Sequence, residues 1–357
     1  MQNFTTIPKN ICILRLSAIG DICHTLPVIR TLQSHWPETK LTWIIGKTEY
    51  ELIKDIPDIN FIVFDKKNGF KEYLNIRAQL ANTSFDVLLH MQMSLRASLV
   101  SVMIKAKIKL GFDKKRAKDA QWLFTNKKIH HTPNQHVIDS LFGFTEALGI
   151  EQHLLNWDIP IPERDQESAK SFLNNIDNYI IVSPCSSKDY RNWHSHGYAK
   201  IIDYIKEHFQ CEVILTGGNS KIENQYAGEI MHACQFSPVN LIGKTNLKEL
   251  LYIIENAKCM ISPDSGPAHM ATAMNTPVIG LYATTNPDRA RPYLSERWLV
   301  NRYPDAIEKK HHKKVKEMPW GTRVRDEWAM DLIKTNDVTT MIDKFMHTLK
   351  NKNEQCL

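Results

Sequence analysis

The sequence predicts an α/β protein built from two doubly wound domains. Its 357 residues exceed what one hydrophobic core usually organises. Short apolar runs alternate with helical patterns along most of the chain, and a charged, proline-containing stretch at residues 156–168 separates two series of such runs. Continuous apolar runs are typical of parallel strands buried on both faces, and right-handed crossovers between such strands give doubly wound sheets.

The strands follow from these runs in order. In the first domain we expect strands at residues 11–16, 41–45, 61–64 and 86–90. In the second we expect them at residues 179–183, 212–216, 239–242, 258–262 and 278–282. The last segment has helical periodicity and no strand after it, so it closes the second domain or crosses back onto the first. The expected organisation is residues 1–160, residues 161–328 and a C-terminal helical segment at 329–357.

Composition narrows the class of protein. Hydrophobic residues make up 43% and charged residues 24%, an ordinary balance for a soluble globular protein. No apolar run has the length of a membrane span, and the N-terminal MQNFTTIPKN lacks the apolar core of a signal peptide. The net charge of +6 indicates an anionic partner, which can be nucleic acid, a membrane surface or a phosphorylated substrate. We therefore expect a cytoplasmic protein.

The cysteines indicate buried thiols in a reducing compartment. They are scattered, several lie inside apolar runs, and no CxxC pair occurs, so neither a disulfide framework nor a zinc site is expected. The seven positions are Cys12, Cys23, Cys185, Cys211, Cys234, Cys259 and Cys356.

Ligands of doubly wound sheets bind at the carboxyl ends of the strands, and the first such end carries RLSAIGDICHTLP, residues 15–27. Gly20 can adopt the positive φ that a turn from strand to helix often requires. Asp21 would then project from a helix N-terminus, either toward a ligand or only as an N-cap. We expect Thr25 to cap a helix with Pro27 in its first turn. The dinucleotide fingerprint GxGxxG is absent.

A second strand end carries ISPDSGPAHMATAMNTPVIGLY, residues 261–282. Asp264, Ser265 and Gly266 form the expected turn, and a helix should begin near Pro267, with His269 in its first turn. Free amides at such a start attract phosphate. Because a carboxylate would repel phosphate, we expect Asp264 to accept hydrogen bonds from sugar hydroxyls or to order the loop. A capped helix without a ligand is the alternative.

Two further strand ends carry polar side chains. The stretch SPCSSKDYRNWHSHGYAKII combines the hydroxyls of Ser186 and Ser187 with the cations Lys188 and Arg191, a set that suits a diphosphate. In LTGGNSKIEN, Glu223 either binds ribose hydroxyls or is an exposed helix charge.

These four stretches, in this order, resemble the lipopolysaccharide heptosyltransferases of glycosyltransferase family 9. SAIGDICHTLP is similar to the N-terminal motif of that family, and SPDSGPAHMATAMNTPVIGLY to its donor-site motif Asp-(Ser/Thr)-Gly-x-x-His. The resemblance covers nearly the whole chain. It implies a GT-B fold, in which two Rossmann-like domains face a central cleft, and an inverting, metal-independent transfer from a nucleotide sugar. In the best-known members the donor is ADP-L-glycero-β-D-manno-heptose and the acceptor is the Kdo of the lipid A inner core. No cofactor is implied, because ADP-heptose is a substrate.

The resemblance also implies roles for single residues. Asp21 matches the proposed catalytic base, and Arg191 matches a phosphate-binding lysine that precedes a tryptophan. Ser186 or Ser187 matches a phosphate-binding hydroxyl, and Glu223 lies near a ribose-binding acid. The donor-binding candidates are Ser186, Ser187, Lys188, Arg191, Glu223, Asp264, Ser265, Gly266 and His269. The acceptor-binding candidates are Gly20, His24, Lys114 and Arg116. The segment at 284–328 is longer and more basic than in the simplest members and resembles heptosyltransferase I-like proteins that act on Kdo.

The implied chemistry agrees with these residue types. A carboxylate can take the proton of a sugar hydroxyl as that hydroxyl attacks the anomeric carbon, with His24 as the nearby alternative base. The charge that develops on the leaving ADP is stabilised by a helix N-terminus and by Lys188 and Arg191. No Asp-x-Asp motif stands in a suitable turn, so no metal site is expected.

Basic residues gather in two clusters. The first comprises Lys105, Lys107, Lys109, Lys114, Lys115, Arg116 and Lys118, and the second Lys309, Lys310, Lys313, Lys314 and Lys316. They face phosphates and carboxylates of lipid A–Kdo or an anionic membrane surface, or they form solvated faces. Aromatic residues lie mostly in strand and helix patterns rather than interleaved in a basic groove, which argues against nucleic acid. We expect peripheral association with the cytoplasmic face of the inner membrane. A GT-B transferase with another donor sugar and a non-catalytic sugar-nucleotide-binding protein remain as alternatives.

Overall fold

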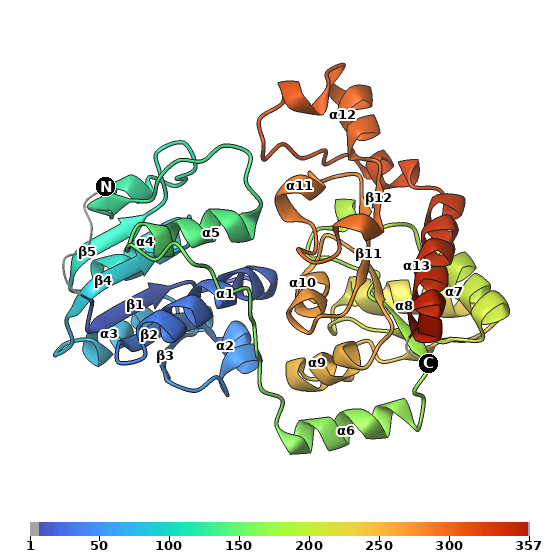
Figure 1. Cartoon of the computed structure of the whole chain (residues 1–357), viewed down its shortest axis with the longest axis horizontal. Coiled ribbons are helices and arrows are strands. Elements are labelled where there is room, and N and C mark those ends of the chain that lie inside the picture. Colours follow the sequence, from blue (N-terminus) through green and yellow to red (C-terminus); the bar gives the residue numbers. More distant parts are fainter. Residues whose placement is uncertain (1–6, 356–357) are drawn as a thin grey trace. The chain divides into compact units, whose positions relative to one another are not determined.

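The computed structural model describes residues 7–355, and for residues 352–355 it describes the backbone alone. Cys356 lies outside the described residues. The chain divides into two compact units, Met1–Pro160 and Ile161–Leu357, and the division falls inside the charged stretch at 156–168. Each unit contains a six-stranded sheet in which every pairing is parallel (Figure 1). The doubly wound α/β class predicted from the sequence is confirmed.

The first unit has the strand order β3-β2-β1-β4-β5-β6. Its elements are β1 (Asn10–Leu14), α1 (Ile19–His35), β2 (Lys40–Gly46), α2 (Lys47–Ile53), β3 (Ile59–Phe64), η1 (Lys66–Asn68), α3 (Phe70–Gln79), β4 (Phe85–His90), α4 (Leu95–Val102), β5 (Ala106–Gly111), η2 (Gln121–Leu123), β6 (Lys127–Lys128) and α5 (Val137–Glu146). β1 lies between β2 and β4, with Ile11 opposite Leu41 on one side and Val87 on the other. Because β1 and β4 diverge into different crossovers, their carboxyl ends form the switch point where ligands of this fold class bind.

The second unit has the order β12-β11-β10-β7-β8-β9. Its elements are α6 (Glu163–Leu173), β7 (Tyr179–Val182), η3 (Asp189–Arg191), α7 (Ser195–Phe209), β8 (Glu212–Leu215), α8 (Lys221–Ala233), β9 (Val239–Asn240), α9 (Leu247–Glu255), β10 (Met260–Pro263), α10 (Gly266–Ala273), β11 (Val278–Tyr282), α11 (Pro287–Ala290), η4 (Glu296–Trp298), β12 (Leu299–Asn301), α12 (Tyr303–His311), η5 (Val315–Glu317), η6 (Glu327–Leu332) and α13 (Thr335–Gln355). Counted from its own first strand, β7, this unit repeats the strand order of the first. Its switch point lies between β7 and β10.

Each unit has its own hydrophobic core. In the first, the β-sheet side chains Cys12 and Leu14 pack with Ile76 of α3 and Val100 of α4. In the second, three residues of α13 spaced by four and three positions join the core of the sheet, namely Val338, Ile342 and Phe345. The C-terminal helix therefore closes the second unit, which is the first of the two predicted alternatives.

Helix α1 begins earlier than predicted. It starts at Ile19, so Thr25 is not its cap, Pro27 lies in its interior, and Gly20 is helical without a positive φ. A proline has no N–H to donate to the carbonyl four residues earlier, here that of Cys23. The indole Nε1 of Trp157 donates to this carbonyl at 2.7 Å instead. A partner far along the chain thus makes a mid-helix proline acceptable, which no local pattern shows.

Three strands were not predicted, namely β5, β6 and β12. In β5, Lys107 and Lys109 alternate with apolar residues, and both lysines have partners. Lys107 forms an ion pair with Asp86 at 2.7 Å, and Lys109 donates to the carbonyl of Ser101 at 2.8 Å. Two members of the first basic cluster are therefore part of a sheet.

The cysteines follow the prediction within the described residues. Cys12, Cys23, Cys185, Cys211 and Cys259 are buried and Cys234 is partly buried, and all six are free thiols. Burial raises the pKa of the Cys185 thiol to about 12, so it is protonated at neutral pH. Among the described residues, no helix combines the length and apolar character needed to cross a membrane.

Candidate active site

At the switch point of the first sheet, only one of the two carboxylate oxygens of Asp21 is bound by neighbouring groups among the residues that the structure describes. Asp21 is the third residue of α1, and its Oδ2 accepts the N–H of the N-cap residue Ala18 at 3.2 Å. The same oxygen forms an ion pair with Nη2 of Arg15 at 2.7 Å. The side chain of Asp21 is 41% exposed, against 9% for Arg15. The N-cap interpretation is therefore wrong, because Ala18 is the N-cap and Asp21 accepts its N–H from within the first turn. Oδ1 of Asp21 stays open to solvent.

Arg15 is itself fixed by the backbone around it. Its Nε donates to the carbonyl of Ser17 at 3.1 Å, and its Nη1 donates to the carbonyl of Met91. The side chain of Gln92 secures the same loop, because its Oε1 accepts the N–H groups of Leu16 at 2.6 Å and Ser17 at 3.3 Å. Arg15 and Gln92 were not predicted as site residues. Gln92 lies two positions after the buried strand β4, which is the signal that could have identified it, whereas Arg15 fell inside the strand predicted at residues 11–16.

The acceptor-binding candidates divide into two groups. Gly20 and His24 lie in the first turns of α1 with Asp21, and His24 is 5% exposed with its ring edge-on to that of His136. Burial makes His24 a poorer candidate than Asp21 for a base that meets an acceptor. Lys114 is exposed, whereas Arg116 donates hydrogen bonds to groups of its own unit. The groups that accept from Arg116 are Asp113, Gln135, Ser140 and the carbonyl of His130.

At the switch point of the second sheet, Asp264 pairs with two predicted site residues. Its Oδ2 lies 3.0 Å from Nη1 of Arg191, and its Oδ1 lies 3.6 Å from Nε2 of His269. The carbonyl of Asp264 also accepts from Arg191 at 3.2 Å. Burial alone would raise the pKa of Asp264, but the hydrogen bond from His269 and the charge of Arg191 outweigh it and hold this pKa below its usual range. Asp264 therefore links Arg191 to His269, and the two roles predicted for it, ordering the loop and accepting from sugar hydroxyls, stay predictions.

The turn after β10 has the predicted geometry. Helix α10 begins at Gly266 with Pro267 in its first turn, and Ser265 is its N-cap, accepting the N–H of Ala268 at 3.4 Å. The hydroxyl of Ser262 lies 2.8 Å from that of Ser265 and donates to the carbonyl of Ser183 at 3.1 Å. The start of α10 is thus tied to the end of β7, where the third motif begins.

The loop after β7 presents both fixed and exposed polar groups. Ser186 donates its N–H to Oδ1 of Asn192 at 2.7 Å, and its hydroxyl bonds to the backbone of Lys188. The side chains of Ser187 and Lys188 are exposed. Two donors of the same loop, Nε of Arg191 and Nδ2 of Asn192, are buried without a hydrogen-bond partner among the described residues. Buried polar atoms are normally paired. These two donors can therefore hydrogen-bond to acceptor atoms of a ligand. Asn192 was not predicted.

Glu223 caps its own helix. Its carboxylate accepts the N–H of Gly218 at 2.6 Å and the N–H and hydroxyl of Ser220 at 3.2 and 2.5 Å. It is therefore more than the exposed helix charge that was the alternative, and it orders the glycine turn at the end of β8. Its predicted role toward ribose stays a prediction.

Comparisons with known proteins decide the family. A family model described as "Glycosyltransferase family 9 (heptosyltransferase)" matches residues 73–319. The chain is also 41% identical to the lipopolysaccharide core heptosyltransferase OpsX of Haemophilus influenzae, over 96% of this chain and 99% of that protein. The chain belongs to glycosyltransferase family 9. It is therefore a glycosyltransferase of the heptosyltransferase family.

Solved structures support the fold of this family 9 enzyme. A family 9 glycosyltransferase of Veillonella parvula aligns with a TM-score of 0.77 at 21% identity, covering 95% of this chain and 97% of that one. The Escherichia coli heptosyltransferase WaaC with ADP aligns with a TM-score of 0.69 at 18% identity, covering 95% and 98%. The predicted GT-B class is confirmed by these neighbours. Within the described residues, no group of three or more His, Cys, Asp or Glu side chains is arranged to hold a metal ion.

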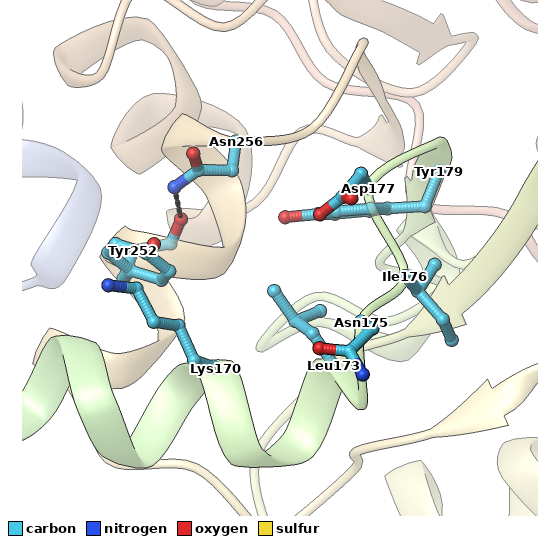
Figure 2. Close-up of a pocket in the computed structure, with 8 residues that line it drawn as sticks. All are labelled: Lys170, Leu173, Asn175, Ile176, Asp177, Tyr179, Tyr252 and Asn256. Atoms are coloured by element: carbon cyan, nitrogen blue, oxygen red, sulfur yellow. Dashed lines mark hydrogen bonds between the residues drawn. The ribbon is translucent and has the colours of Figure 1, made fainter.

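A cavity of about 310 Å³ in the second unit lies away from these motifs (Figure 2). It is lined by residues of α6 and α9 and by the segment that enters β7, where Tyr179 is the first strand residue. Figure 2 shows Lys170 beside the ring of Tyr252, with its Nζ 5.7 Å from the ring centroid. The cavity is at the amino end of β7, whereas the candidate site residues follow the carboxyl ends of the strands.

The second basic cluster is partly engaged within the second unit. Lys309 places its Nζ 4.2 Å from the ring centroid of Trp328, and Lys310 pairs with Asp326 at 2.5 Å. Both lysines belong to α12, and His312 ends this helix in a left-handed conformation. Lys313, which follows the helix, is exposed.

Proposed function

We propose that this enzyme transfers L-glycero-D-manno-heptose from ADP-heptose to the Kdo of the lipid A inner core, in lipopolysaccharide biosynthesis. The observation that carries the proposal is the 41% identity, over nearly the full length of both chains, to a protein named as a lipopolysaccharide core heptosyltransferase. The site geometry supports it, because each switch point presents the groups that such a transfer needs.

The first unit supplies the base. The acceptor hydroxyl loses its proton to Oδ1 of Asp21 as its oxygen forms the bond to the anomeric carbon. The bond from this carbon to the phosphate oxygen of ADP breaks with its electron pair going to ADP. Attack from the opposite face inverts the anomeric centre, so one carboxylate is sufficient. Arg15 holds Oδ2 and thereby leaves Oδ1 for the acceptor.

The second unit binds the donor. Arg191, Lys188 and the amides at the start of α10 are the groups for the diphosphate, and they stabilise the charge on the leaving ADP. The unpaired Nδ2 of Asn192 adds a donor at the same loop. Asp264 and His269 keep the guanidinium of Arg191 in place. Glu223 and the hydroxyls of Ser186, Ser187 and Ser265 complete the proposed donor set.

The proposed acceptor is lipid-anchored, so we also propose peripheral association with the cytoplasmic face of the inner membrane. Gly20 and His24 lie beside Asp21 and belong to the proposed acceptor site. Lys114 is exposed and suits an acidic group of the acceptor, whereas Arg116 shapes the loop that carries it. No cofactor or nucleic acid is part of this proposal.

A donor screen tests the function. Purified enzyme is given lipid A–Kdo and a panel of ADP- and UDP-sugars, and nucleotide release is measured with and without acceptor. We expect acceptor-dependent ADP release from ADP-heptose and an inverted anomeric configuration in the product by NMR. Preferential release of UDP, or of ADP from another ADP-sugar, would instead support the transferase with a different donor. Nucleotide release at the same rate with and without acceptor would contradict both transferase functions.

A further inference from the structure

Helix α4 carries an apolar face that the described residues of its unit leave exposed. Leu95, Leu99 and Val102 are spaced by four and three residues, so they lie on one side of the helix. The opposite side packs into the core through Ala97 and Val100, both fully buried. A short helix with apolar residues on both sides has more apolar surface than its own fold uses.

The same face continues into η2. Oδ2 of Asp119 accepts the N–H of Leu95 at 3.3 Å, which brings the loop before η2 to the start of α4. The buried side chain of Gln121 donates to the carbonyls of His90 at 2.8 Å and Gln92 at 3.3 Å, which fixes η2 at the end of β4. The two residues after Gln121 then point outward. The five apolar side chains of this α4–η2 face are 42 to 64% exposed, and they are Leu95, Leu99, Val102, Trp122 and Leu123.

The segment of the chain that carries the α4–η2 face is strongly positive. Residues 95–128 contain ten Lys or Arg and two Asp, a net charge of +8 that exceeds the +6 of the whole chain. The exposed basic side chains in this segment are Arg96, Lys105, Lys107, Lys114, Lys115, Lys118, Lys127 and Lys128. An anionic bilayer surface has two layers, negative headgroups and the boundary of the acyl chains beneath them. Lysines suit the headgroups, and leucine and tryptophan side chains suit the acyl boundary.

We propose that the α4–η2 face docks this enzyme onto an anionic lipid bilayer, with the five apolar side chains entering the headgroup region and the surrounding lysines binding lipid phosphates. The face borders the loop of Asp21, because Gln92 joins both. Its carbonyl accepts from Gln121 of η2, and its Oε1 accepts from Leu16 and Ser17. Docking therefore places the proposed base close to the bilayer surface, where the sugar of a lipid-anchored acceptor is attached to its lipid. In this respect the inference rests on the proposed function.

Vesicle binding tests the docking directly and without substrate. The full-length enzyme is sedimented with vesicles of phosphatidylcholine alone or of phosphatidylcholine mixed with phosphatidylglycerol. Two variants remove the apolar anchors, one with Leu99→Ser and Val102→Ser, and one with Trp122→Ser and Leu123→Ser. A matched control carries Phe236→Ser and Leu294→Ser, two side chains of the second unit with similar exposure. Circular dichroism and thermal melting confirm that each variant is folded.

We expect wild type and control to bind the anionic vesicles, with binding that weakens as salt rises, and to bind neutral vesicles poorly. Each anchor variant should lose about tenfold or more in affinity, since interfacial binding scales with the apolar area that enters the lipid. The fluorescence of wild type should shift to the blue on binding, and a Trp122→Phe variant should lose most of this shift. Equal binding by wild type and both anchor variants, or no binding by wild type, would overturn the proposal and leave the face for a protein partner.

Activity measurements separate this inference from the proposed function. With a deacylated, soluble acceptor, the anchor variants should release ADP at the wild-type rate. With the acceptor embedded in anionic vesicles, they should show a raised apparent KM. A wild type that binds vesicles but transfers to neither acceptor would refute the proposed function and leave the docking surface standing. Variants that match wild type on embedded acceptor would refute the docking.

Discussion

At the scale of single residues, Asp21 has the most specific proposed role, that of the base, because its two carboxylate oxygens have different surroundings. Replacing Asp21 by Asn keeps the shape and removes the base. We expect kcat to fall by about a hundredfold or more, since this is the usual contribution of a general base. Affinity for ADP, measured by calorimetric titration, should stay within a few-fold because ADP is bound by the other unit in our proposal. A variant that keeps most of its turnover at saturating substrates would remove Asp21 from the chemistry.

Arg191 and Asp264 form a buried ion pair, and each of the two residues also has a proposed role in donor binding. Arg191→Ala should weaken binding of both ADP and the full donor, because it removes a cation from the proposed diphosphate site. Asp264→Asn should weaken both ligands, because it loosens Arg191, and it should weaken the full donor more than ADP, because Asp264 is also a candidate for the sugar hydroxyls. Unchanged affinities for both ligands in both variants would place the pair outside the site.

The stability of the pair should depend on pH in a defined direction. The pKa of Asp264 in the folded protein lies below its ordinary value of 3.8, so its stabilising effect is complete above that value and is lost as the pH falls through the lower folded one. Breaking a buried ion pair typically costs about 3–5 kcal/mol. The difference in Tm between wild type and Asp264→Asn should therefore be large at neutral pH and shrink in strong acid. An equal difference at every pH would show that charge is not the cause.

The sequence predicted which residues stand at the strand ends but not what each side chain contacts. Asp264, Ser265 and His269 were found because they follow an apolar run. The pairing of Asp264 with Arg191 spans 73 positions, and no local pattern encodes it. The role of Arg15 was missed for a related reason, since its contact with Asp21 depends on the turn between them.

Among the elements, α1 depends on a partner outside itself. Trp157 supplies the N–H that Pro27 cannot give to the carbonyl of Cys23. Trp157→Phe should cost about 1–3 kcal/mol in the free energy of unfolding, because it leaves a buried carbonyl unpaired, in addition to the lost packing. Pro27→Ala restores the helix N–H, so the same change should cost less in that background. Denaturant unfolding of the four proteins of this double-mutant cycle measures the difference, and equal costs in both backgrounds would contradict the explanation.

The elements that the sequence missed are those whose pattern is weak or mixed. β5 alternates lysine with apolar residues, and we interpreted its lysines as part of a basic cluster although alternation also indicates a strand half in contact with solvent. β6 and β12 have two and three residues, which is too short for any periodicity to show. The buried strands β2 and β11 were predicted to within one residue at each end, because every position of their apolar runs is buried.

At the scale of the whole molecule, the proposed donor site lies within one unit that has its own core. ADP should therefore stabilise the second unit in particular. Scanning calorimetry should show ADP shifting the transition of this unit, by about 2.7 kcal/mol of stability at a hundredfold excess over Kd. The Arg191→Ala variant is the control and should show a reduced shift. A shift of equal size for wild type and variant would mean that ADP binds elsewhere.

The two sheets share one strand order, and the residues proposed for donor and acceptor sit at equivalent switch points in separate units. If the proposed sites are correct, substrate choice is modular. A chimera joined at residue 160 would take its nucleotide sugar from the parent of the second half and its acceptor from the parent of the first. Relatives of this family could then exchange sugars in the course of evolution by recombination at a single point, without rebuilding either sheet.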